Sequence, residues 1–143
     1  MHEFSRSAVI AATPEKVWDV VGDFGALGEW HPVVPPSSIE GGVDANTPGA
    51  VRAFAIDGEV LSREELLTYD ADAHRMTYSL LQVPLPVENY VGTFEVKPHP
   101  EGSEVVWSAT YDGADDIVGT VDAVFAEGTY GAGLQALRER FSA

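Results

Sequence analysis

The sequence of 143 residues contains no cysteine. This absence excludes disulfides, thiolate metal ligands and cysteine nucleophiles, and it fits a reducing compartment. A chain of this length forms one domain by the usual scaling and buries a core that needs no covalent or metal support. We therefore expect a single domain that spans residues 1–143.

Basic residues are scarce. Lys and Arg together number 8, against 23 Asp and Glu, which gives a formal net charge of −15 at pH 7. Such a surface repels nucleic-acid phosphates and anionic lipid headgroups. We expect neither nucleic acid nor membrane as a partner, and the excess of negative charge is most simply what keeps the protein in solution.

Long apolar runs are absent as well. No segment approaches the ~20 consecutive apolar residues that cross a bilayer. The first residues, from Met1 to Arg6, do not show the basic region followed by an apolar run that is typical of a secretory signal. The sequence therefore predicts a cytoplasmic protein.

Common catalytic and metal-binding patterns are missing too. The chain has no Gly-x-Ser-x-Gly elbow, no phosphate loop and no dinucleotide fingerprint. Its four histidines, at positions 2, 31, 74 and 99, do not have the helical i, i+4 spacing or the Cys/His spacing of a metal site. We expect no metal and no cofactor.

The first informative segment is a short helix followed by a loop. Thr13 is placed to cap the helix, and Pro14 suits its first position. The helical pattern then ends in a loop that carries Trp30 and His31 directly before Pro32, which favours an extended conformation at His31. An aromatic ring and a titratable imidazole at such a junction predict the mouth of a pocket.

The middle of the chain reads as strands separated by turns rich in Gly, Pro and Asp. The pair Asp57-Gly58 is typical of a tight hairpin turn. Short connections between successive strands favour an antiparallel meander of about seven strands in one sheet. The expected strands are 4–11, 38–43, 49–56, 59–69, 75–81, 88–97 and 104–112.

A long helix is expected from Asp115 to about Phe141, with acidic residues at its start and arginines near its end, as the helix dipole favours. At about 100° per residue, the apolar residues around Val121 lie nearly opposite those around Tyr130, so either the helix bends or both of its faces are covered. Glycines in the segment 128–133 leave the helix without bulk there. This predicts room for a ligand beneath that segment.

Five short motifs occur in a characteristic order: Thr13–Trp18, Trp30–Pro32, Gly49–Arg52, Pro84–Val87 and Tyr130–Leu134. With the order of elements, they resemble the helix-grip superfamily, also called SRPBCC or START-like, and within it the bacterial polyketide cyclase/dehydrase-like proteins. The resemblance covers essentially the whole chain. It implies an α+β, Bet v 1-like fold, in which a sheet of about seven strands wraps around the long C-terminal helix and two short helices follow the first strand.

The same resemblance implies a cavity between the concave face of the sheet and the long helix. Members bind lipids, hormones or polyketides, or cyclise and dehydrate aromatic intermediates, so the resemblance alone does not assign an activity. Strand parity predicts which side chains face the cavity. The side chains expected to point inward include Tyr78, Glu88, Tyr90, Trp107 and Tyr111. The aromatic residues among them either bind a ligand or fill the core. The three inward phenols need polar partners.

Two charged residues interrupt the apolar pattern of adjacent strands. Arg52 shares its parity with Phe54, and Glu64 shares its parity with apolar neighbours on the next strand. A buried charge is costly unless it is paired, so the two are expected to face inward and interact. Two roles remain open for the pair: an internal ion pair that fixes the strand register, or a contact with a ligand. Phe54 is expected to contact the same ligand.

The entrance to the pocket is predicted to be formed by Trp30, His31 and the loop around Leu85, because proline stiffens both segments. The leading interpretation is a protein that binds a small hydrophobic or aromatic, polyketide-like molecule in an internal cavity.

Two other functions are left open. One is a cyclase, dehydratase or aldol-type lyase in which His31 or Glu64 transfers a proton and a Tyr or Arg stabilises an enolate. The other is a protein that forms a homodimer, or binds another partner, through a face of Ile117, Val121 and Val124.

Overall fold

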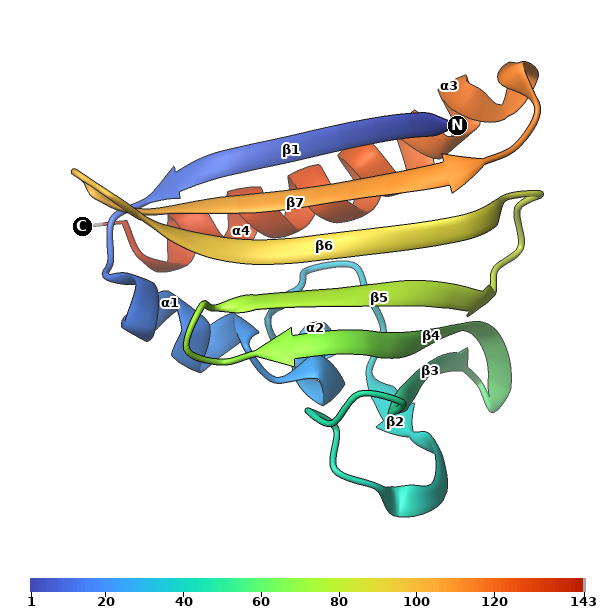
Figure 1. Cartoon of the computed structure of the whole chain (residues 1–143), viewed down its shortest axis with the longest axis horizontal. Coiled ribbons are helices and arrows are strands. Elements are labelled where there is room, and N and C mark those ends of the chain that lie inside the picture. Colours follow the sequence, from blue (N-terminus) through green and yellow to red (C-terminus); the bar gives the residue numbers. More distant parts are fainter. Residues whose placement is uncertain (143) are drawn as a thin grey trace.

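Seven antiparallel strands form one sheet in the order β1-β7-β6-β5-β4-β3-β2 (Figure 1). The computed structural model describes residues 1–142. The predicted meander is confirmed, and the first strand joins it by pairing with the last. The strands are β1 (His2–Ile10), β2 (Ser37–Ile39), β3 (Val51–Ile56), β4 (Glu59–Asp70), β5 (Arg75–Gln82), β6 (Glu88–His99) and β7 (Gly102–Asp112).

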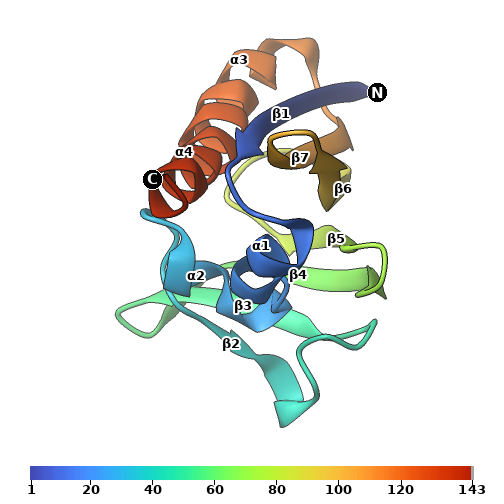
Figure 2. The same cartoon turned by 90° about the vertical axis from the view of Figure 1, so that its left-hand side faces the viewer.

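Short helices follow the first strand, as expected. They are α1 (Pro14–Val21), η1 (Phe24–Ala26) and α2 (Leu27–Trp30). The hydroxyl of Thr13 accepts a hydrogen bond from the backbone N–H of Lys16 at 3.4 Å, which confirms the predicted cap. These helices and the C-terminal helix all lie on the concave side of the sheet (Figure 2).

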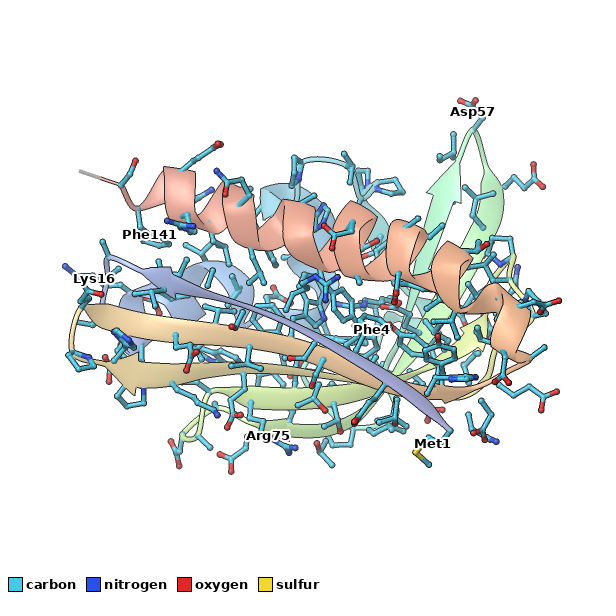
Figure 3. The ribbon with its side chains drawn as sticks, turned by 90° about the horizontal axis from the view of Figure 1, so that it is seen from above. Met1, Phe4, Lys16, Asp57, Arg75 and Phe141 are labelled. Atoms are coloured by element: carbon cyan, nitrogen blue, oxygen red, sulfur yellow. The ribbon has the colours of Figure 1, made fainter. Side chains whose placement is uncertain are left out.

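The C-terminal helix runs from residue 115 to residue 140 without a break, which confirms the predicted long helix. Its parts are η3 (Asp115–Ile117), α3 (Val118–Val121), η4 (Asp122–Gly131) and α4 (Ala132–Arg140). The helix lies along β1, and Phe4 of that strand is placed between the two (Figure 3), where its ring centroid is 5.1 Å from that of Tyr130.

The segment η4 is a π-helix of 10 residues, and it settles the question of the two apolar faces. A π-helix bonds residue i to i+5 and therefore turns less per residue than an α-helix. The buried residues Val121, Ala126 and Tyr130 consequently fall on one side of the helix, at spacings of five and four. The face predicted to bind a partner is therefore not continuous: Val121 lies in the core and Val124 is 45% exposed. Self-association stays a prediction.

Two irregularities change the expected strands. The strand expected at 38–43 is shorter, because the chain turns at Gly41 and Gly42, which have φ of 72° and 67°. Glu88 was predicted to point inward, and this is wrong. Asn89 has φ of 52° and the register with β7 shifts beside it, so that Glu88 lies exposed while Tyr90 is buried.

The hairpin between β3 and β4 stands out from the sheet beside the long helix, with Asp57 at its tip (Figure 3). Asp57 and Gly58 have φ of 53° and 81°, as a two-residue hairpin turn of type I′ requires. The predicted turn is confirmed. Within residues 1–142, no helix is long and apolar enough to cross a membrane.

Candidate functional site

A cavity of about 160 Å³ lies between η4 and the inner faces of strands β3 to β7. An engineered core cavity of ~150 Å³ binds benzene, so this space accepts one aromatic ring. Six of the ten residues that the sequence predicted to bind a ligand line it, although contact with a ligand stays a prediction: Arg52, Phe54, Glu64, Tyr78, Tyr90 and Trp107.

Three phenol hydroxyls meet in the wall of the cavity. The hydroxyl of Tyr130, on η4, lies 2.8 Å from that of Tyr78 on β5 and 2.5 Å from that of Tyr90 on β6. The indole N–H of Trp107 donates to the Tyr78 oxygen at 2.9 Å. The ring of Tyr130 also stacks on Trp107, with centroids 4.2 Å apart and an interplanar angle of 8°. Together these contacts fix the helix against the sheet.

A glycine opposite Tyr78 makes this arrangement possible. Gly92 is the register partner of Tyr78 on the adjacent strand. A Cβ atom at Gly92 would lie within 2.3 Å of the Tyr78 Cζ atom, so only glycine lets the ring lie across β6. The hydroxyl of Tyr78 thereby reaches Tyr130.

Burial decides the protonation state of the three phenols. Removal from water raises the pKa of Tyr78, Tyr90 and Tyr130 well above the ordinary value for a phenol. The negative charge of Glu64 further raises the pKa of both Tyr78 and Tyr90. The phenols therefore stay neutral at ordinary pH, where they act as hydrogen-bond donors and not as bases.

Arg52 and Glu64 form the internal ion pair that strand parity predicted. They are register partners on β3 and β4, and their side chains are 5% and 13% exposed. The Glu64 Oε1 atom accepts a hydrogen bond from Arg52 Nε at 2.8 Å and forms an ion-pair contact with Nη2 at 2.7 Å. Arg52 Nη1 also donates to the carbonyl oxygen of Phe24 at 3.0 Å.

The two carboxylate oxygens of Glu64 are not equivalent. Both contacts from Arg52 are with Oε1, and Oε2 accepts no hydrogen bond from any group within residues 1–142. Glu64 lines the cavity, so the site combines neutral donors with one carboxylate oxygen that can still accept. This pairing of groups can bind and polarise a small organic molecule.

A second, more apolar pocket of about 260 Å³ adjoins the first. Leu61, Ser62, Glu64 and Phe125 line both, so these residues separate the inner cavity from the outer pocket. Leu85, predicted at the entrance, lines the outer pocket and not the inner cavity. A molecule larger than one ring would have to pass this boundary.

His31 is not among the residues that line the inner cavity, and its predicted place at the mouth is wrong. The side chain is buried, at 4% exposure. Its Nε2 atom lies 2.6 Å from the carbonyl oxygen of Thr129, and its Nδ1 atom accepts from the backbone N–H groups of Val33 and Val34 at 3.1 and 3.2 Å. A neutral imidazole with its proton on Nε2 satisfies all three groups. His31 therefore joins the 31–34 loop to η4, and no face of it is free for proton transfer.

Two further predicted residues lie behind the cavity. Trp30 packs against Trp107, with centroids 6.1 Å apart, and its indole N–H has no hydrogen-bond partner within residues 1–142. Tyr111 packs near the chain start, against His2 and Phe4. Neither is among the lining residues of the inner cavity.

The cavity lies under only part of the helix segment 128–133, where the sequence predicted space for a ligand. Gly133 packs directly on the sheet side: a Cβ atom there would be 2.8 Å from His31 Cδ2 and 3.1 Å from Trp107 Cζ3. The cavity borders Thr129 and Tyr130 of this segment and extends towards Phe125. Sequence reasoning missed these residues as a site, because only the wider turn of η4 brings them to the same side.

Two glycines of the C-terminal helix should respond to alanine in opposite directions. Gly119→Ala should raise the free energy of unfolding by up to about 1 kcal/mol, because no atom lies within 4 Å of the new methyl group. Gly133→Ala should lower it by about 1–2 kcal/mol, because the methyl group displaces His31 or Trp107. Urea unfolding of both variants measures the difference, and a gain at both positions would contradict the close packing of Gly133.

Comparisons with known proteins place this geometry among related structures. A family model described as "Polyketide cyclase / dehydrase and lipid transport" matches residues 1–142. A solution NMR structure from Thermobifida fusca is similar at 35% identity over 99% of this chain and 93% of that one, with a TM-score of 0.90. The protein XoxI from Bacillus cereus is similar at 31% identity over 99% and 96% of the two chains, with a TM-score of 0.81.

A more distant likeness is to norcoclaurine synthase from Thalictrum flavum, whose structure was solved with dopamine and hydroxybenzaldehyde. It is 19% identical over 97% of this chain and 85% of that one, with a TM-score of 0.74, and it therefore supports the fold alone. No curated protein matches the chain. The predicted α+β, helix-grip fold of the Bet v 1 type is confirmed.

Proposed function

The chain belongs to the polyketide cyclase/dehydrase and lipid transport family, and from that premise we propose that it binds a small aromatic molecule in the cavity beneath η4. The observation that carries the proposal is an inner cavity of about 160 Å³ walled by Tyr78, Tyr90, Trp107 and Tyr130, with neutral polar groups in its wall. Concave, mostly aromatic sites with a few converging polar groups are typical of small-molecule binding.

The sizes of the two spaces limit the ligand. The inner cavity accepts one ring, and the outer pocket of about 260 Å³ accepts apolar atoms attached to it. Phe125 and Glu64 stand between them, so the ligand is best described as one aromatic ring with an apolar substituent. A fused ring system needs Phe125 to move.

Shortening Phe125 should widen the range of ligands. Phe125→Ala should increase the affinity for 2-acetylnaphthalene about tenfold relative to acetophenone, because removal of the ring joins the two spaces and lets the second ring be buried. The control is Val124→Ala, which changes an exposed residue that lines only the outer pocket. Isothermal titration calorimetry measures both affinities. The proposal fails if neither compound binds the unmodified protein, and the boundary role of Phe125 fails if both variants behave alike.

Glu64 supports a second candidate function, a cyclase, dehydratase or aldol-type lyase. Its free Oε2 atom could take a proton from a carbon next to a ligand carbonyl while a phenol donates a hydrogen bond to the carbonyl oxygen, which yields a hydrogen-bonded enolate and a protonated carboxyl group. The same carboxylate is engaged by the buried guanidinium of Arg52, and a proton on Glu64 would remove the charge that pairs with Arg52. Binding is therefore the first candidate.

An exchange experiment separates the two functions. If Glu64 enolises a bound ketone, the methyl protons of acetophenone exchange with deuterium in D2O faster in the presence of the protein, and Glu64→Gln abolishes the gain. If acetophenone binds but its methyl protons exchange no faster than in buffer, the enolisation function is excluded and only the binding function remains.

A further inference from the structure

The hydroxyl cluster of Tyr78, Tyr130 and Tyr90 contains more hydrogen-bond donors than acceptors. Three neutral phenols bring three O–H protons, and the two contacts between their oxygens use two of them. Trp107 adds a further N–H donor, which occupies a lone pair of the Tyr78 oxygen. Within residues 1–142, no other acceptor contacts the three hydroxyls.

One proton is therefore left over in every arrangement of the cluster. If the bonds run from Tyr78 through Tyr130 to Tyr90, the surplus proton is on Tyr90; in the reverse direction it is on Tyr78. If both outer phenols donate to Tyr130, the surplus proton is on Tyr130. All three side chains line the inner cavity, so an acceptor for this proton has to come from the cavity.

We propose that the cluster is a donor site for an uncharged acceptor oxygen, and that the ligand is an aromatic ketone, aldehyde or related carbonyl compound. The inference rests on the proposed binding function and specifies which chemical group the ligand brings. A buried O–H without a partner costs free energy, and a carbonyl oxygen at the cluster removes that cost.

The charges around the cavity favour a neutral ligand over an anion. The guanidinium of Arg52 is engaged by Glu64 and by the Phe24 carbonyl. The free Oε2 atom of Glu64 belongs to a residue that lines the same cavity and would repel a carboxylate or phosphate. A single surplus phenol proton suits one carbonyl oxygen.

A matched pair of ligands tests the site. Acetophenone and α-methylstyrene have the same shape, with an oxygen in the first where the second has a CH2 group. In the variant with Tyr78, Tyr90 and Tyr130 all changed to Phe, the affinity for acetophenone should fall about tenfold, while that for α-methylstyrene should change less than twofold. Equal losses for both ligands would overturn the proposal, since they would reflect altered packing.

The proton count also makes a prediction for a single substitution. Tyr90→Phe removes one hydroxyl and one hydrogen bond together, so one surplus proton remains on Tyr78 or Tyr130. The affinity of this variant for acetophenone, relative to α-methylstyrene, should therefore stay within about twofold of the unmodified protein. Loss of the whole preference in this variant would show that Tyr90 alone is the donor and would overturn the shared site.

A measurement on the unmodified protein keeps the proposal testable if the triple variant does not fold. The carbonyl stretching band of 13C-labelled acetophenone should lie at lower frequency when bound than in hexane, because the oxygen accepts a hydrogen bond. Binding with a hexane-like frequency would overturn the donor site and leave the binding function intact. Failure of both ligands to bind would overturn the binding function itself.

Discussion

Glu64→Leu should lower the free energy of unfolding by about 3–5 kcal/mol, because it leaves Arg52 charged, buried and without its carboxylate. The Arg52 side chain is 5% exposed and its guanidinium carbon lies 4.0 Å from the ring centroid of Phe24, so water is a poor substitute for the lost partner. Urea unfolding at pH 7 measures the loss. We expect this to be among the most damaging single substitutions in the sheet.

The double variant, Arg52→Met with Glu64→Leu, should be more stable than the Glu64→Leu protein, because no unpaired charge remains buried. It still loses the bond from Arg52 to the Phe24 carbonyl, which limits the recovery. The control is the pair Arg63 and Glu40, which has a 2.7 Å contact but side chains that are 34% and 40% exposed. Removing either member there should have little effect on stability. Additive losses at Arg52 and Glu64 would contradict their coupling.

The Arg52–Glu64 pair could be predicted because side chains in a strand alternate with a period of two. A residue two or four places along a strand returns to the same face, so errors in the exact strand ends do not matter. Tyr78, Tyr90 and Trp107 were placed by the same rule. The rule fails only where the alternation is broken, as at Asn89, whose positive φ turns Glu88 outward.

The helical half of the site could not be predicted in the same way. The face of a helical residue depends on an angle that accumulates along the chain, and at about 100° per residue Val121 and Tyr130 come out on opposite sides. The π-helical segment lies between them and turns less per residue, so both are buried. The sequence of Asp122–Gly131 carries no local signal that we recognise for this conformation.

His31 was misplaced for a different reason. Its neighbours in the sequence, Trp30 and Pro32, indicated a loop at a pocket mouth, but its deciding partner is Thr129, 98 residues away. Gly133 provides the space for the ring. A contact of this kind has no signature in a single sequence, because the glycine and the carbonyl oxygen could each serve many other roles.

His31→Leu should lower the free energy of unfolding by about 3 kcal/mol at pH 7, because it leaves the N–H groups of Val33 and Val34 and the carbonyl oxygen of Thr129 without their partner. Val34 and Thr129 bond to opposite ring nitrogens of His31, and both residues border the inner cavity. The loss should therefore appear in stability first, and acetophenone should still bind the folded fraction at low temperature.

The same histidine should make stability depend on pH. Burial lowers the pKa of His31, an effect that the hydrogen bond to Thr129 only partly offsets, whereas in the unfolded chain the pKa stays near 6.5. As the pH falls below about 6.5, the unfolded chain binds a proton at this histidine that the folded protein does not bind. The free energy of unfolding therefore decreases until the pH reaches the lower pKa of the folded protein. Above that range the contribution is fully present. Protonated Nδ1 would also face the two N–H groups that it now accepts from.

Urea unfolding at pH 7.5 and pH 5.5 checks this sign. The unmodified protein and a His99→Gln control, changed at the last residue of β6, should lose stability over this interval by similar amounts. His31→Gln should lose clearly less, because the group whose pKa differs between the folded and unfolded states is gone; comparing variants also cancels the titration of the many carboxylates. An equal loss in all three proteins would show that His31 is not held neutral by its place between the loop and η4.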